Sequence, residues 1–105
     1  AKNLRGQPVA VFCGIANPED FRRILEQIRA RVVDYHPFPD HHEYTSADLR
    51  AIEETARRVG AKYILTTEKD AVKLNPNSFS LPAYKVSLDM EILEGREVFN
   101  RHVLN

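Results

Sequence analysis

The stretch Phe38 to Tyr44, FPDHHEY, holds the most distinctive chemistry of this sequence, an aspartate followed by two histidines. An imidazole has an ordinary pKa of about 6.5, so it can bind a metal ion or transfer a proton near neutral pH. Neighbouring side chains in extended backbone point in opposite directions, and His41 and His42 should therefore play different roles. We expect one to face a site, as a general base or the partner of one with Asp40 orienting its ring, and the other to face solvent or the next helix. The alternative is that both are solvated loop residues and that Asp40 only caps a turn.

The rest of the sequence supports a metal site poorly. A closed site needs three or four ligands, and neither His36 nor His102 stands at a recognisable ligand spacing from this loop. Asp40-His41-His42 also resembles the signature of the DHH phosphoesterases, which bind manganese and need an upstream D-x-D. The chain contains no D-x-D. We therefore predict no metal ligands, and a DHH-type phosphoesterase stays an alternative function.

Two further motifs could contact an anionic ligand. In Gly14-Ile15-Ala16-Asn17-Pro18 the glycine permits a tight exit from a strand, and Asn17 and Pro18 are typical of a helix start, whose free N–H groups attract anions. In Thr67-Glu68-Lys69-Asp70 the first and last residues are explained as helix caps. That leaves Glu68 and Lys69 to project, so we predict Asn17, Glu68, Lys69 and His42 as secondary substrate contacts.

The elements that would position these residues follow from hydrophobic periodicity and from capping residues. Strands are predicted at 8–15, 31–36, 62–66 and 84–92, and helices at 17–28, 45–59, 67–74 and 96–104. The alternation of polar and apolar residues in the segment 84–92 favours a half-buried strand at a sheet edge.

This order predicts a single α/β domain over residues 1–105. We expect a small three-layer domain, with a mainly parallel sheet of about four strands and helices on both faces. The carboxyl ends of parallel strands share one edge, where ligands usually bind. The loops that carry the three motifs should therefore converge there.

Composition excludes several classes of function. The 105 residues include 15 Lys and Arg and 15 Asp and Glu, so the net charge is zero and a broad nucleic-acid-binding surface is not expected. The lone Cys13 lies in an apolar run, as a buried thiol would. No apolar stretch is long enough to span a bilayer, and no signal peptide is visible. The chain starts at Ala1 without a methionine, as expected for part of a longer protein.

Three motifs occur together in order: Gly14 to Pro18, Phe38 to His42, and the stretch TEKDAVKL from Thr67 to Leu74. Together they resemble the C-terminal part of the tetraacyldisaccharide 4′-kinases, which act in lipid A biosynthesis in Gram-negative bacteria. The resemblance extends from about Pro8 to the last predicted strand.

The resemblance implies a two-domain P-loop kinase at the cytoplasmic side of the inner membrane, in peripheral contact with it. The enzyme would transfer phosphate from ATP, with Mg²⁺, to the 4′-hydroxyl of a tetraacyldisaccharide 1-phosphate, the lipid A precursor. The family pattern Phe-x-Asp-His matches Phe38, Asp40 and His41, which assigns catalysis to His41, beside Asp40.

In that family the N-terminal lobe binds ATP and Mg²⁺ and supplies the aspartate that pairs with this histidine. The present sequence contains no G-x-x-x-x-G-K-[ST], so we expect no cofactor-binding residue here and no kinase activity from the chain alone. A non-catalytic α/β binding module is the remaining alternative.

Overall fold

The computed structural model describes residues 3–75 and 77–87, and the backbone of 99–103. The elements, in order, are β1 (Pro8–Cys13), α1 (Pro18–Ile28), β2 (Arg31–Pro37), α2 (Ser46–Arg58), β3 (Tyr63–Thr67), α3 (Glu68–Ala71), β4 (Ala83–Val86) and β5 (Phe99–Val103). The strands form one sheet in the order β2-β1-β3-β4-β5, in which β5 is antiparallel to β4 and the other pairs are parallel. The predicted α/β class and the mainly parallel sheet are confirmed.

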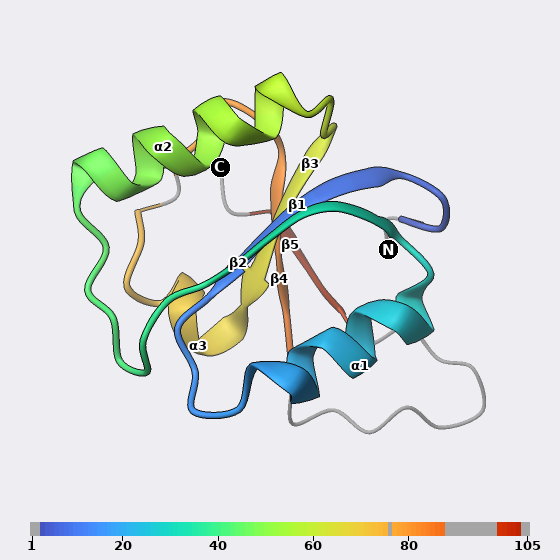
Figure 1. Cartoon of the computed structure of the whole chain (residues 1–105), viewed down its shortest axis with the longest axis horizontal. Coiled ribbons are helices and arrows are strands. Elements are labelled where there is room, and N and C mark those ends of the chain that lie inside the picture. The colour runs from blue at the N-terminus through green and yellow to red at the C-terminus, as the bar shows by residue number, and fades with distance from the viewer. Residues whose placement is uncertain (1–2, 76, 88–98, 104–105) are drawn as a thin grey trace.

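Helices cover both faces of the sheet, with α1 and α2 on opposite sides (Figure 1). Phe21 and Leu25 of α1 join one buried cluster with alternate residues of β1, and Ile52 and Ala56 of α2 join the other. Every residue of β1 is buried, as its continuous apolar run predicts for a strand covered on both faces. None of the described helices is long and apolar enough to cross a membrane.

The C-terminal part of the sheet differs from the prediction in two ways. Residues 99–103, expected within a helix at 96–104, form strand β5 instead, which pairs with β4. Strand β4 is consequently flanked by β3 and β5 and does not lie at an edge. A short segment such as this takes its conformation from the strand it pairs with, which local periodicity cannot reveal. The predicted strand residues 88–92 lie outside the described part of the chain.

The connections reverse direction next to β1. From β1 the chain passes through α1 to β2 on one side, and α2 then carries it back to β3 on the other side of β1. In doubly wound sheets such a reversal separates the loops at the carboxyl ends of the two central strands, and the gap between them is the usual ligand site. Here β1 ends at Cys13 and β3 at Thr67, so the segments concerned begin at Gly14 and Glu68.

Candidate functional site

The three motif loops converge at the carboxyl edge of the sheet, as the predicted topology requires. The backbone N–H of Phe38 donates to the carbonyl of Cys13 at 2.6 Å, and the N–H of His41 donates to the carbonyl of Gly14 at 3.2 Å. The N–H of Gly14 in turn donates to both carboxylate oxygens of Asp70, at 3.1 Å each. The loops after β1, β2 and β3 are thus directly bonded to one another.

Asp70 lies at the centre of this arrangement and is fully buried. Besides the Gly14 N–H, its carboxylate accepts hydrogen bonds from the Tyr44 hydroxyl at 3.0 Å and from the Thr67 hydroxyl. Its own N–H donates to the Thr67 oxygen at 3.0 Å, which caps α3. The predicted cap by Thr67 is confirmed, but the Asp70 carboxylate, also expected to cap the helix, instead bonds to groups at the ends of β1 and β3.

His42 is built into the fold. Its ring stacks on Phe38 with centroids 4.5 Å apart, meets the edge of Tyr44 at 4.9 Å, and hydrogen-bonds through Nε2 to Asp48 at 2.8 Å. Only 24% of the side chain is exposed, and Lys73 Nζ donates to its carbonyl at 2.9 Å. As predicted for one member of the pair, His42 faces the adjoining helix, because Asp48 belongs to α2.

His41 has the opposite environment. Its side chain is 73% exposed, and its Nε2 lies 3.6 Å from Oδ2 of Asp40, whose side chain is 37% exposed. The backbone is left-handed, with a φ of 61°, whereas the sequence interpretation assumed extended backbone. This conformation costs a non-glycine residue roughly 1–2 kcal/mol, which the bonds of the loop must supply. The two histidines have different environments, as expected, but the cause is the left-handed backbone at His41 and not an extended strand.

The residues predicted as secondary contacts follow the carboxyl ends of the parallel strands β1, β2 and β3. Asn17 is exposed and is the N-cap residue of α1, as predicted, although its side chain makes no capping hydrogen bond. Lys69 is exposed and Glu68 half-buried, both in α3. Among the described residues, no group of three or more histidine, cysteine, aspartate or glutamate side chains could hold a metal ion.

Thr45 and Asp48 form a complete capping box at the start of α2, which anchors the loop from its other end. Asp48 N–H donates to the Thr45 hydroxyl at 3.0 Å, and the Thr45 N–H donates to the Asp48 carboxylate at 3.0 Å. This backbone bond, followed by the contact with His42, holds the pKa of Asp48 below its ordinary value. One carboxylate therefore starts the helix and fixes the inner histidine.

Two protonation states at this edge follow from burial. Burial, with the neighbouring Asp70 as the next cause, raises the pKa of Tyr44 far above its ordinary value, so its hydroxyl remains a donor. Burial likewise raises the pKa of the Cys13 thiol, even though the Tyr35 hydroxyl 3.9 Å away opposes the shift. The predicted buried thiol is confirmed, and a neutral buried thiol is a poor nucleophile.

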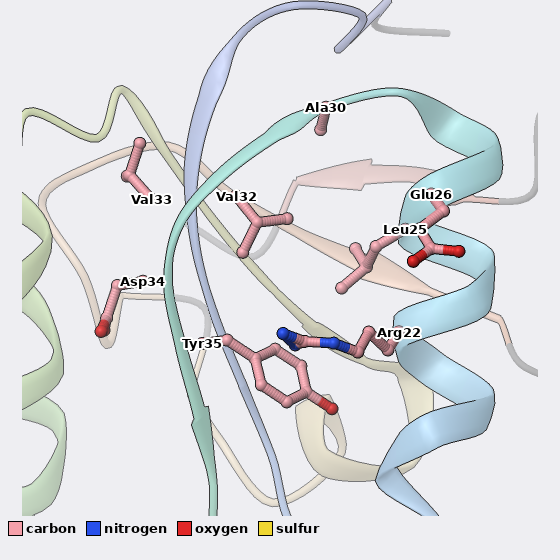
Figure 2. Close-up of a pocket in the computed structure, with 8 residues that line it drawn as sticks. All are labelled: Arg22, Leu25, Glu26, Ala30, Val32, Val33, Asp34 and Tyr35. Atoms are coloured by element: carbon pink, nitrogen blue, oxygen red, sulfur yellow. The ribbon is translucent and has the colours of Figure 1, made fainter.

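A groove of about 480 Å³ lies elsewhere, between α1 and the edge strand β2. Figure 2 shows its lining, with the Arg22 guanidinium against the Tyr35 ring at 4.5 Å from the centroid. None of the residues predicted to act in the site lines this groove. A smaller hollow of about 240 Å³ between β2 and α2 is lined in part by Phe38 of the histidine loop (Phe38–Tyr44) and by Asp48 of α2.

Comparison with known protein families identifies the family of this chain. A family model described as tetraacyldisaccharide-1-P 4′-kinase matches residues 1–105. The chain belongs to this family. The resemblance seen in the three motifs is therefore confirmed, and membership of the kinase family disfavours the DHH phosphoesterase reading.

Curated tetraacyldisaccharide 4′-kinases are similar to most of the chain. The protein of Syntrophus aciditrophicus (strain SB) is 44% identical over 90 residues, which are 85% of this chain and 24% of the relative. That of Anaeromyxobacter dehalogenans (strain 2CP-C) is 40% identical over 98 residues, which are 90% of this chain and 26% of the relative. The chain thus spans about a quarter of the length of these kinases. No solved structure matches it.

Sequence reasoning about this kinase-family domain missed the role of Asp70. The pattern Thr67-Glu68-Lys69-Asp70 has the same spacing as Thr45-Ser46-Ala47-Asp48, and both are helix starts. In α2 the acid bonds back to the capping residue's N–H, whereas in α3 it turns to Gly14 and Tyr44. No local signal separates the two uses, because the second depends on residues 56 and 26 positions away.

Proposed function

We propose that this chain is the C-terminal lobe of a longer lipid kinase, which transfers the γ-phosphoryl group of ATP to the 4′-hydroxyl of tetraacyldisaccharide 1-phosphate. An N-terminal P-loop lobe of the same protein would bind ATP and Mg²⁺, and the enzyme would act at the cytoplasmic face of the inner membrane. Family membership supports the reaction, and the contrast between the two histidines supports the role of this lobe.

His41 is the proposed catalytic residue. It is presented to solvent at the ligand edge of the sheet, while the backbone that carries it is bonded to Gly14. An exposed imidazole on a fixed backbone can meet an acidic group of a second lobe without leaving its own domain. Asp40, whose Oδ2 lies 3.6 Å from Nε2 of His41, would help to orient the imidazole.

The chemistry requires little more of this lobe. Phosphoryl transfer depends mainly on positioning and charge stabilisation, with a base needed for the attacking hydroxyl. His41, paired with an aspartate of the N-terminal lobe, would complete that base when the lobes close over substrate. The exposed Lys69 and Asn17 are proposed contacts for the anionic lipid headgroup, and Glu68 and His42 are the further proposed contacts.

The test compares His41→Ala with His42→Ala in the complete kinase, with phosphate transfer from ATP to the lipid acceptor as the readout. His41→Ala should lower kcat by about 10²–10⁴-fold, the usual contribution of a general acid–base group. His42→Ala should mainly lower stability, because that ring packs on Phe38 and bonds to Asp48. Equal and mild effects on kcat would contradict the assignment and favour a binding module.

A further inference from the structure

Asp70 is the one fully buried carboxylic acid among the described residues. Burying a carboxylate is unfavourable unless hydrogen bonds replace its hydration, and here three different groups donate to it: the Gly14 N–H, the Tyr44 hydroxyl and the Thr67 hydroxyl. Helix capping alone does not require burial. Asp48, at the same position of α2, caps its helix with 27% of its side chain exposed. The burial of Asp70 therefore needs a second explanation.

The contacts of Asp70 lead to the histidine loop by two routes. On the first, Gly14 donates its N–H to Asp70 and accepts the N–H of His41 with its carbonyl at 3.2 Å. On the second, the Tyr44 hydroxyl donates to Asp70 at 3.0 Å, three residues after His41 in the chain. The loop is thus connected to the same carboxylate at His41 itself, through Gly14, and at Tyr44.

Packing makes this attachment stiff. The Tyr44 ring lies edge-on against Phe38 and against Phe12 of β1, with centroids 5.2 Å apart in both pairs. At Gly14 an added Cβ would lie 3.0 Å from the carbonyl oxygen of Pro39, so β1 and the loop are in close backbone contact. A shift of the Tyr44 hydroxyl would therefore move the backbone around His41.

We infer that Asp70 is a positioning residue for His41, acting through Tyr44 and Gly14. This inference rests on the proposed function, in which His41 takes part in phosphoryl transfer. Asp70 reaches no substrate itself, because it is fully buried. It holds the loop in the conformation that presents the imidazole, including the left-handed backbone at His41.

The carboxylate suits this task better than an amide would. Bonds to a charged acceptor are shorter and stronger than neutral ones, and both oxygens of Asp70 accept from the Gly14 N–H at 3.1 Å. In Asp70→Asn one oxygen becomes an NH₂ donor, so at least one of these contacts is lost while the shape is kept. A misplacement of 1 Å can cost on the order of 100-fold in rate, so we expect kcat to fall roughly 10- to 100-fold.

The test is a double-mutant cycle in the complete kinase, with Asp70→Asn and Tyr44→Phe made singly and in a His41→Ala background. Each single variant should lower kcat, with little change in KM for ATP or for the lipid acceptor. In the His41→Ala background neither should lower kcat further, because the group they position is gone. Tyr35→Phe is the matched control: it loses the hydroxyl bond to the Pro18 carbonyl at 2.7 Å and the weaker contact with the Cys13 thiol at 3.9 Å, and should keep wild-type kcat.

The outcomes distinguish a failure of the positioning role of Asp70 from a failure of the proposed function. If His41→Ala retains wild-type kcat, the proposed function fails, and the positioning role fails with it. If His41→Ala is impaired but the Asp70 and Tyr44 variants keep full kcat, or lower it equally in both backgrounds, only the inference is overturned. Equal losses in Tyr35→Phe and Tyr44→Phe would also overturn it. Should Asp70→Asn not fold, Tyr44→Phe decides by the same criteria.

Discussion

Gly14→Ala offers a sharp test of how the histidine loop is held. The new Cβ would lie 3.0 Å from the Pro39 carbonyl oxygen, 3.1 Å from the Tyr44 hydroxyl and 3.2 Å from Cβ of His42. These are tight contacts on both the backbone and the side chains of one loop. The loop must therefore move away from β1 by a few tenths of an ångström, which weakens the bond from the His41 N–H to the Gly14 carbonyl.

The expected magnitudes follow from this geometry. Overpacking of a buried position costs about 1–3 kcal/mol of the free energy of unfolding. Because a 1 Å misplacement can cost about 100-fold in rate, a shift of a few tenths of an ångström should lower kcat by roughly 10-fold. Gly60→Ala is the matched control. Gly60 has a φ of 80° with open space around it, and alanine there costs about 1–2 kcal/mol through backbone strain alone.

Two measurements on Gly14→Ala and Gly60→Ala test whether the contact with β1 fixes the loop. Urea unfolding should show comparable losses of stability for Gly14→Ala and Gly60→Ala, while phosphate transfer by the complete kinase should fall only for Gly14→Ala. Gly60 follows the far end of α2 from the loop, so its strain does not reach His41. A Gly14→Ala enzyme with wild-type kcat would refute the claim that the contact with β1 fixes the loop. If Gly14→Ala and Gly60→Ala lowered kcat equally, the effect of Gly14→Ala would be explained by general destabilisation of the domain.

Two further predictions concern the stability of the domain. Asp70→Ala leaves the buried donors of Gly14, Tyr44 and Thr67 without their acceptor. In urea unfolding it should lower the free energy of unfolding by roughly 3–5 kcal/mol, against about 1–2 kcal/mol for Asp70→Asn. Equal losses in the two variants would contradict this. Burial raises the pKa values of Tyr44 and Tyr35, so their stabilising effect is complete below the unfolded pKa of about 10 and is lost as pH rises above it. Stability should fall above about pH 10, and less steeply in Tyr44→Phe; an unchanged slope would exclude Tyr44 as a cause.

The first two-thirds of the fold could be predicted because its signals are local. The apolar run of β1, the Asn17-Pro18 helix start and the capping box at Thr45 each specify an element within a few residues. The segment Phe99–Val103 could not be predicted in this way. Its strand conformation depends on pairing with Ala83–Val86, and that pairing also removes β4 from the sheet edge.

The candidate site likewise has features that the sequence predicts and features that depend on the assembled fold. Parallel topology alone was enough to predict that the loops would meet, and the difference between His41 and His42 was expected from their adjacency. The reason for the difference was not: it lies in the left-handed backbone at His41 and in the bond from His42 to Asp48. Asp70 escaped prediction because its partners are brought to it only by the assembled sheet.

The attachment of the loop to a buried carboxylate also determines how that loop can open. Surface loops usually unfold locally at little cost in free energy, and their amide protons exchange quickly with water. Opening the loop here would separate Tyr44 from Asp70 and the His41 amide from Gly14, leaving a buried charge short of donors. The loop should therefore open only together with the carboxyl end of the sheet. In the proposed two-lobe kinase, such a domain would bring its histidine to the other lobe by moving as one body, with the hinge outside the segment Pro8–Leu74.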